Sequence, residues 1–279
     1  MSESGKSVSV RDIAEKKGHE RIVMLTAYDA PSAKLLDEAG VDVLLVGDSV
    51  EMAVYGESST LTAQMDSMIR HARAVARASR RALVVGDMPF LSYQASAADA
   101  VRNAGRFLAE AGAAAVKVEG GRRVLPSVEA ILAADIPVMG HVGMTPQSFR
   151  KFGGFKVQGR SRDSADEILE DAVALEKAGC FSVVLECVPD ALAQRITAQL
   201  SIPTIGIGAG PHCDGQVLVF HDLLGLSGEF RPKFVRRYAD LGEIIRDAAR
   251  RFSEDVRSGE FPSAGETFLS DAPALRRVH

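Results

Sequence analysis

Short, unbroken runs of apolar residues recur along the chain, and most are rich in valine, leucine or isoleucine. Runs of this length without a polar position predict strands that are buried on both faces, as in a parallel sheet. The pattern predicts eight such strands, near residues 22–27, 42–47, 82–86, 114–119, 136–141, 182–186, 203–207 and 216–220.

Most of the segments between these runs place apolar residues at helical spacing, and residues 62–79 and 164–178 are the clearest examples. Gly40, Gly112 and Gly179 each stand between a predicted helix and the next strand, where glycine adopts a left-handed cap without strain. Repeated helix–glycine–strand units predict consecutive right-handed crossovers. With eight strands, a closed (β/α)8 TIM barrel is the expected α/β fold, and an open doubly wound sheet is the alternative.

Two helical segments fall outside this repeat. Residues 11–17 predict an extra N-terminal helix that covers the bottom of the barrel, and residues 234–258 predict a final amphipathic helical region. The tail over about 260–279 shows little pattern and is expected to be flexible. Since no segment has the composition of a linker, we expect one catalytic barrel domain over residues 1–279.

Composition excludes several classes of protein. A net charge of -4, with no dominant basic block, argues against nucleic-acid binding. No apolar stretch approaches the roughly 18 residues of a membrane helix, and the polar start of the chain lacks a signal-peptide pattern. Cys180, Cys187 and Cys213 show no CxxC spacing, which favours neither disulfides nor a zinc site. A cytoplasmic protein is expected.

Carboxylic acids stand at the C-terminal ends of three predicted strands. Asp48, Asp87 and Glu119 would converge at the end of a barrel where active sites lie. Three carboxylates crowded together repel one another unless a cation lies among them, and a ligand set made only of oxygen suits Mg²⁺. For each acid taken alone, a helix cap or a surface ion pair is the alternative.

Three further strand-end residues carry chemistry. Lys117 lies two positions before Glu119, so both side chains point the same way. A lysine there binds a substrate carboxylate or offsets developing negative charge, unless it only neutralises Glu119. His141 either donates a hydrogen bond to a substrate oxygen or has a structural role. Glu186 is the candidate general base.

Two loops also draw attention. Residues 205–210 are rich in glycine but lack both GxGxxG and P-loop spacing, so we interpret them as a close-packed strand end. Residues 143–162 form a long loop with five basic residues and no acid, which is either a binding element or a solvated surface. The basic residues are Arg150, Lys151, Lys156, Arg160 and Arg162.

Eight segments in order over residues ~9–268 resemble the ketopantoate hydroxymethyltransferase family, a breadth that isolated motifs do not reach. They are MLTAYD at 24–29, LVGDS at 45–49, DMPF at 87–90, KVEGG at 117–121, GHVGMTPQS at 140–148, GGFKVQGR at 153–160, LECVP at 185–189, and IGIGAG at 205–210 followed by CDGQ at 213–216.

This resemblance implies a Mg²⁺-dependent TIM barrel that assembles as a homo-oligomer, often a decamer. It implies transfer of a hydroxymethyl group from 5,10-methylenetetrahydrofolate to 3-methyl-2-oxobutanoate (α-ketoisovalerate), giving ketopantoate in pantothenate biosynthesis. The matching positions imply a metal site at Asp48, Asp87 and Glu119, ketoacid binding by Asp48, Ser49, Asp87 and Lys117, proton acceptance by Glu186, and an active-site histidine at His141.

Some positions depart from the family pattern. Glu51 replaces a small residue after the GDS motif and is expected to add an acid near the metal; Glu57 replaces a common histidine or tyrosine. An alternative function is a lyase of the phosphoenolpyruvate mutase and isocitrate lyase type, which acts on an α-ketoacid without folate. A third is an inactive ketoacid-binding barrel. A further hypothesis is that the basic loop near 150–162 binds the acidic tail of the folate.

Overall fold

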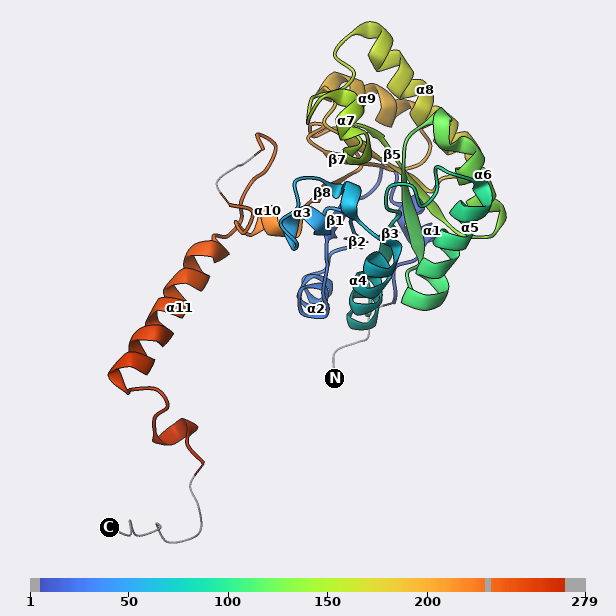
Figure 1. Ribbon diagram of the computed structural model, residues 1–279. Helices are drawn as coiled ribbons and strands as arrows, with labels where there is room; N and C mark the ends of the chain where they lie inside the picture. Colours follow the sequence, from blue (N-terminus) through green and yellow to red (C-terminus); the bar gives the residue numbers. More distant parts are fainter. Residues whose placement is uncertain (1–5, 229–231, 269–279) are drawn as a thin grey trace, which may run out of the picture.

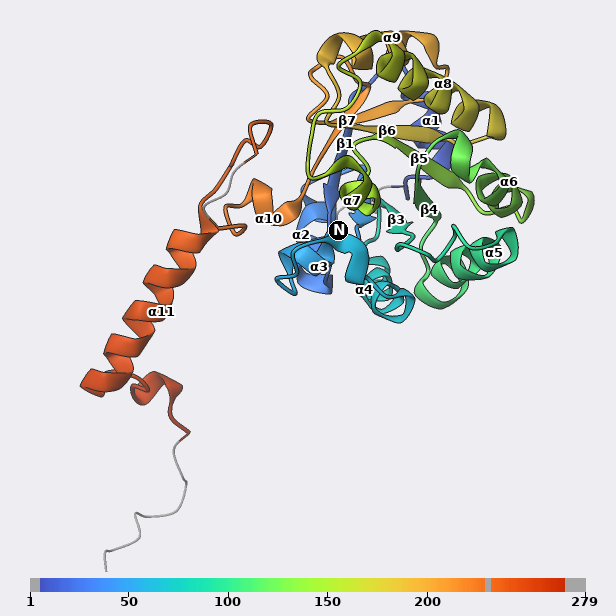
Figure 2. The ribbon, with the colours of Figure 1, turned by 45° about the horizontal axis from the view of Figure 1, so that its top comes forward.

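A computed structural model describes residues 6–228 and 232–268 of the 279-residue chain. Eight parallel strands pair in sequence order, and β8 pairs with β1 to close the barrel (Figure 1, Figure 2). The predicted TIM barrel is therefore confirmed, and the open sheet is wrong. The strands are β1 (Ile22–Thr26), β2 (Val43–Val46), β3 (Leu83–Asp87), β4 (Ala115–Glu119), β5 (Val138–Gly143), β6 (Ser182–Glu186), β7 (Thr204–Ile207) and β8 (Gly215–Leu218).

Helices follow most strands and cover the outside of the barrel, as the apolar spacing of the sequence predicts. The α-helices are α1 (Val10–Glu15), α2 (Ala30–Glu38), α3 (Val50–Ala53), α4 (Met65–Ala78), α5 (Ala97–Arg106), α6 (Leu125–Ala133), α7 (Phe149–Phe152), α8 (Arg162–Ala178), α9 (Asp190–Gln199), α10 (Phe220–Leu223) and α11 (Leu241–Ser258). Gly40, Gly112 and Gly179 have φ values of 87°, 78° and 108°, the left-handed conformation expected of them.

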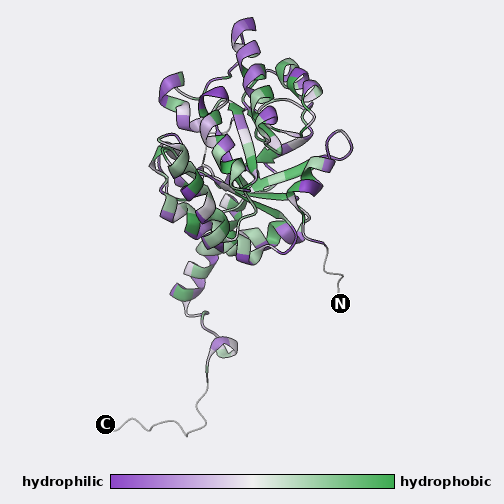
Figure 3. Cartoon of the chain, turned by 90° about the vertical axis from the view of Figure 1, so that its right-hand side faces the viewer, coloured by the Kyte–Doolittle hydropathy of each residue, from purple (hydrophilic) through white to green (hydrophobic). Residues whose placement is uncertain are grey.

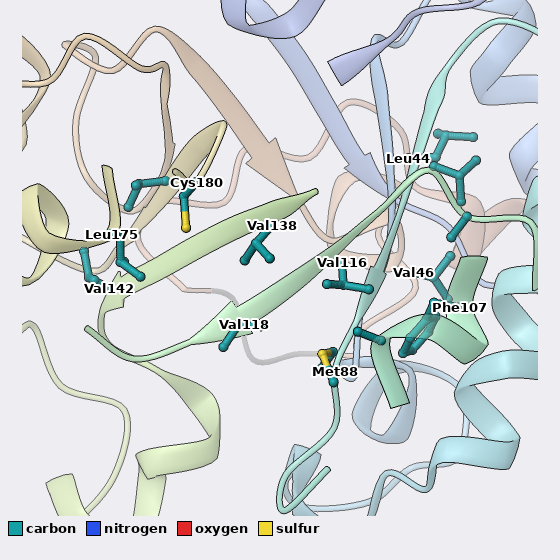
Figure 4. Packing of buried hydrophobic residues seen from close by; sticks show 14 of the residues in the cluster. Leu44, Val46, Met88, Phe107, Val116, Val118, Val138, Val142, Leu175 and Cys180 are labelled. Carbon is teal, nitrogen blue, oxygen red and sulfur yellow. The ribbon is translucent and has the colours of Figure 1, made fainter. Parts of the chain in front are cut away.

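The hydrophobic core has two layers. One lies between the strands and the surrounding helices, where Val46, Val116 and Val138 pack with Phe107 and Leu175 (Figure 4). The other fills the inside of the barrel with side chains that alternate with the first set along each strand. Alternate residues of a strand therefore belong to different layers, and this decides which polar side chains enter the barrel.

The N-terminal helix α1 closes the bottom of the barrel, as predicted for residues 11–17. Its Ile13 is fully buried against the inward-facing residues of the strands. Two lysines that follow the helix reach acids at the N-terminal ends of strands. Lys16 Nζ lies 3.0 Å from Asp42 Oδ1, and Lys17 Nζ lies 2.8 Å from Asp214 Oδ2.

The last helix, α11, extends away from the barrel (Figure 1, Figure 2). The prediction of a helix over 234–258 is correct only from residue 241, because the Asp240 side chain caps the helix there by accepting a hydrogen bond from the Glu243 N–H. None of its residues is buried in this chain. The expected flexible tail of residues 260–279 lies partly outside the described residues, and the single domain over 1–279 stays a prediction.

Candidate active site

The alternation of the two core layers turns a group of polar side chains into the barrel. On β4, Ala115 packs in the inner layer, whereas Val116 and Val118 pack in the outer one. Lys117 and Glu119 share the parity of Ala115, so they face inward. The same alternation turns three more side chains inward, at the C-terminal ends of β3, β5 and β6: Asp87, His141 and Glu186.

The register between neighbouring strands places the C-terminal ends of β3, β4 and β5 at the same level along the barrel axis. Asp87 pairs with Lys117 across β3 and β4, and Glu119 pairs with His141 across β4 and β5. Asp48 follows β2, and its backbone N–H donates to Asp87 Oδ2 at 3.1 Å. The predicted convergence of these acids with Lys117 and His141 at one end of the barrel is what the structure shows.

Lys117 lies at the centre of this group. Its Nζ is 2.9 Å from Asp87 Oδ1, 3.9 Å from Glu119 Oε1 and 3.2 Å from His141 Nδ1. Each of these four residues, like Asp48, is at most 3% exposed. A single ammonium therefore faces three buried carboxylates, which leaves the group with an excess of negative charge. We call Asp48, Asp87, Lys117 and Glu119 the acidic group.

The pKa shifts reflect this excess. Burial and the charges of Asp87 and Glu119 raise the pKa of Asp48 well above its ordinary value. Burial also raises the pKa of Asp87. Burial alone would lower the pKa of Lys117, but the neighbouring carboxylates outweigh burial and raise it, so this side chain stays an ammonium. Burial therefore favours the neutral form of Asp48 and Asp87, whereas His141 and Lys117 outweigh burial at Glu119 and lower its pKa.

His141 connects the acidic group to Glu186. Its Nδ1 lies 3.6 Å from Glu119 Oε1, and its Nε2 lies 3.2 Å from Glu186 Oε2. Burial and the Lys117 ammonium lower the pKa of His141, but its contacts with Glu119 and Glu186 outweigh them and raise it. The Glu186 side chain is 15% exposed, so it is more open than the acids beyond the histidine. A carboxylate in this position can contact a ligand that lies over the acidic group.

Gln147 is a site residue that sequence reasoning missed. Its Nε2 donates to Asp48 Oδ2 at 3.0 Å, and its backbone N–H donates to Glu119 Oε2 at 3.0 Å. Its Oε1 accepts from the Tyr93 hydroxyl at 2.8 Å, and that hydroxyl also accepts from the Glu119 N–H. Gln147 lies in the GHVGMTPQS segment, but nothing in the spacing of that segment shows that the chain after β5 reaches Asp48, which follows β2.

One carboxylate oxygen of the acidic group, Glu119 Oε1, is buried without a hydrogen-bond partner, and Asp87 Oδ1 contacts only the Lys117 ammonium, at 2.9 Å. Buried acceptors of this kind are uncommon, because each lost hydrogen bond is costly. No set of three His, Cys, Asp or Glu ligands is assembled around one point among the described residues.

Other residues of interest lie around this group. The Ser49 hydroxyl is 2.8 Å from the Tyr28 hydroxyl beside Asp48. Glu51 is buried on α3, where its Oε2 accepts from Thr62 Oγ1 at 3.1 Å. Burial raises the pKa of Cys187 to about 12, which keeps this thiol neutral.

The glycine-rich segment at the end of β7 and just after it packs closely, as predicted. A Cβ on Gly206 would lie 2.9 Å from Cys213 Sγ, and one on Gly210 would lie 2.5 Å from Asp190 Cβ.

Comparison with known proteins decides the family. The family model described as ketopantoate hydroxymethyltransferase matches residues 7–264. The chain belongs to this family. A 3-methyl-2-oxobutanoate hydroxymethyltransferase of Pelobacter propionicus is 54% identical over 269 residues, covering 96% of this chain and all of the relative. One of Moorella thermoacetica is 59% identical over 255 residues, covering 91% of this chain and 95% of the relative. The predicted family, a family of transferases, is confirmed.

Solved structures support the fold alone. A 2,3-dimethylmalate lyase of the PEP mutase/isocitrate lyase superfamily is 15% identical with a TM-score of 0.58, covering 93% of this chain and 91% of that chain. Phosphonopyruvate hydrolase in complex with oxalate and Mg²⁺ is 15% identical with a TM-score of 0.60, covering 92% of each chain. Identity this low shows a shared barrel architecture and favours no lyase activity over the transferase.

Proposed function

We propose that this protein transfers a hydroxymethyl group from 5,10-methylenetetrahydrofolate to 3-methyl-2-oxobutanoate, giving ketopantoate for pantothenate biosynthesis. The main support for this proposal is the arrangement of the site. The buried acidic group has three carboxylates and one ammonium, and His141 separates it from Glu186, whose carboxylate is more exposed. This arrangement suits binding of a ketoacid over the acidic group and removal of a proton from its C3.

The chain's own residues account for proton removal and charge stabilisation. Glu186 accepts the C3 proton of the ketoacid, which is acidic because it lies beside the ketone. Negative charge then builds on the keto oxygen, where the Lys117 ammonium offsets it. His141 orients Glu186 through its Nε2.

The transfer itself balances without an oxidant. The C3 carbon forms a bond to the methylene carbon of the carrier, whose bonds to nitrogen break. One water supplies the hydroxyl group, and tetrahydrofolate is released.

The acidic group fits Mg²⁺. Glu119 presents a buried oxygen without a hydrogen-bond partner, and Asp87 and Asp48 complete an oxygen-only donor set. Mg²⁺ commonly uses one or two protein carboxylates and completes its shell with water and ligand oxygens, so the lack of a closed three-ligand cluster agrees with this ion. We assign Asp48, Asp87 and Glu119 as the residues that hold it, with Ser49 and Lys117 contacting the ketoacid. When bound, Mg²⁺ would supply Lewis acidity toward the keto oxygen.

One experiment separates this function from the alternatives. Purified protein is incubated with 3-methyl-2-oxobutanoate, Mg²⁺ and 5,10-methylenetetrahydrofolate, and products are followed by NMR. The proposal expects ketopantoate only when the carrier is present. Cleavage of an α-ketoacid without carrier would support a lyase, and the absence of any product would leave a binding protein.

The exposed apolar face of α11 supports assembly into a homo-oligomer, with a decamer as the form that the resemblance implies. Ile244, Ile245, Phe252 and Val256 are each at least 48% exposed, although α11 is amphipathic (Figure 3). An amphipathic helix gains most of its stability from packing its apolar face. We propose that a second copy covers this face, which size-exclusion chromatography with light scattering tests: a monomer would contradict it.

Cytoplasmic residence remains a proposal as well. Its support is three cysteines that are all free thiols, which suits a reducing compartment. None of the helices in the described ranges is long and apolar enough to cross a bilayer.

A further inference from the structure

A cavity of about 510 Å³ lies between the segments that follow β2, β3, β4 and β5, and Gln147 separates it from the acidic group. Gln147 lies in its wall and donates to Asp48 Oδ2 at 3.0 Å, so the cavity and the acidic group share this side chain. The lining residues that matter for its chemistry are Leu61, Phe90, Val124, Arg123, Arg150 and Lys151.

All charged side chains that line this cavity are positive. Arg123, Arg150 and Lys151 line it, and no acid does. Arg123 is positioned by a 2.9 Å hydrogen bond from its Nη2 to Ser148 Oγ. Within the described part of the chain, none of the three cations pairs with a carboxylate. Three unpaired cations around one hollow attract an anion with more than one negative group.

A neighbouring hollow gives a contrast. It measures about 160 Å³ and shares Arg123 and Lys151 with the larger cavity, but Glu167 and Asp171 also line it. Its charges are balanced, and its volume is too small for a ligand with several rings. The larger cavity is therefore the better site for an anionic ligand of substantial size.

The same cavity also has an apolar part. Leu61, Phe90 and Val124 contribute to its wall, and the Phe90 side chain is 38% exposed although it is large and apolar. An exposed aromatic ring beside a hollow offers a stacking surface for a flat ligand. Apolar and cationic parts together select a molecule that carries aromatic rings at one end and carboxylates at the other.

We propose that this cavity binds the one-carbon carrier, with its ring system against Leu61, Phe90 and Val124 and its glutamate carboxylates toward Arg123, Arg150 and Lys151. The inference rests on the proposed function and deepens it. A volume of about 510 Å³ lies within the range of pockets that bury most of a ligand of this size. Gln147 marks the point where the carrier and the ketoacid meet.

The test compares two double variants that remove equal charge from the segment between β5 and α8. This segment, predicted as one long loop over residues 143–162, contains the short helix α7, and Arg162 begins α8. Arg150→Ala with Lys151→Ala empties one side of the cavity, whereas Arg160→Ala with Arg162→Ala changes basic residues outside it. We expect the first pair to raise the KM for 5,10-methylenetetrahydrofolate by about tenfold, since charge-assisted contacts to carboxylates are among the strong ones. We expect the KM for 3-methyl-2-oxobutanoate to stay within about twofold of the wild-type value. The kcat at saturating carrier should also stay within about twofold, because neither residue contacts the ketoacid site. The second pair should leave the KM for the carrier unchanged.

A carrier without glutamate makes the test specific. With the methylene derivative of tetrahydropteroyl methylamide, which has the rings but no carboxylate, the first double variant and the wild type should show the same KM. An unchanged carrier KM in the first variant, or a rise that persists with the methylamide, would overturn the inference. Failure of the proposed function looks different, because the wild type would then form no ketopantoate with either carrier.

Discussion

Both ends of this barrel carry buried carboxylates, but the two ends differ in how fully the chain pairs these carboxylates. At the bottom, Asp214 binds Lys17 at 2.8 Å and also accepts from the Thr204 N–H at 2.8 Å and the Gly18 N–H at 3.3 Å. Asp42 accepts from Lys16 at 3.0 Å and from the Val23 N–H at 3.0 Å. These carboxylates have their charge and their hydrogen bonds satisfied by the chain itself.

At the top, the acidic group has one ammonium for three carboxylates, and Glu119 Oε1 is buried without a hydrogen bond. The same kind of side chain is thus used for stability at one end and kept incompletely paired at the other. A buried charge without a full set of partners destabilises the protein while no ligand is bound. Such a charge is retained at sites where a bound ligand supplies the missing partners. The comparison predicts that equivalent substitutions have opposite consequences at the two ends.

Among substitutions at the top of the barrel, Glu186→Gln should have the largest effect on kcat. Because it removes the proton acceptor and keeps the shape of the side chain, we expect kcat to fall by about 10²–10⁴-fold, while ketoacid binding is retained. Steady-state kinetics and ligand titration measure the two quantities. Glu254→Gln on α11, exposed and far from the barrel, is the matched control. A kcat near that of the wild type would remove Glu186 as the base.

Asp214→Asn should have the largest effect on the bottom. It leaves the Lys17 ammonium beside a neutral amide and turns an amide group toward backbone donors. We expect the free energy of unfolding to fall by about 3 kcal/mol, the scale for breaking a buried ion pair. Urea denaturation measures this loss. The kcat of the folded enzyme should stay at the wild-type value; a large fall in kcat without loss of stability would contradict the division between the ends.

Asp48→Asn makes the same chemical change at the top. We expect the Mg²⁺ concentration for half-maximal activity to rise at least about tenfold. Removing a residue that only hydrogen-bonds to a metal ligand can already lower metal affinity by this factor. Stability without metal should stay the same or increase, because one of three repelling carboxylates is neutralised. Titration of activity with Mg²⁺ and thermal unfolding in chelator test both parts. A clear loss of stability would show that Asp48 is structural.

The smallest expected effect concerns Asp37 at the bottom, through the pH dependence of stability. Burial acts to raise its pKa, but hydrogen bonds from the N–H groups of Ala82, Arg80 and Arg81 outweigh burial and lower it. The folded pKa thus lies below the unfolded value of about 3.9, so its stabilisation is present above that pH and is lost as pH falls through the folded pKa. Asp37→Asn should cost about 1 kcal/mol at pH 7 and progressively less below about pH 4. A difference that stays constant from pH 7 to 3 would contradict this.

Much of the fold was predictable because strands buried on both faces leave a strong pattern. All eight strands, the helix that closes the bottom and the glycine caps follow from the apolar runs and the residues that end them. The start of α11 was missed, because an apolar pattern continues through residues 234–240 and only the Asp240 cap fixes the boundary. The position of α11 away from the barrel was also beyond the sequence, since its apolar face looks like that of any packed helix.

The candidate site was predictable where the strands alone place the side chains. Asp87, Lys117, Glu119, His141 and Glu186 lie at strand ends, so parity and register position them. Gln147 and the cavity lined by Arg123, Arg150 and Lys151 depend on how loops fold over the barrel, and a single sequence carries no comparable signal for that. The roles assigned to these residues remain predictions for experiment.

The most direct test of the central claim is the exchange of the C3 proton of 3-methyl-2-oxobutanoate in D₂O, followed by proton NMR without any folate. We predict that the wild-type protein with Mg²⁺ removes the C3 signal, and that Glu186→Gln and Asp48→Asn slow this removal strongly while Asp214→Asn does not. No exchange in the wild type, or equal exchange in Glu186→Gln, would contradict the assignment of the upper end of the barrel as the site that removes this proton.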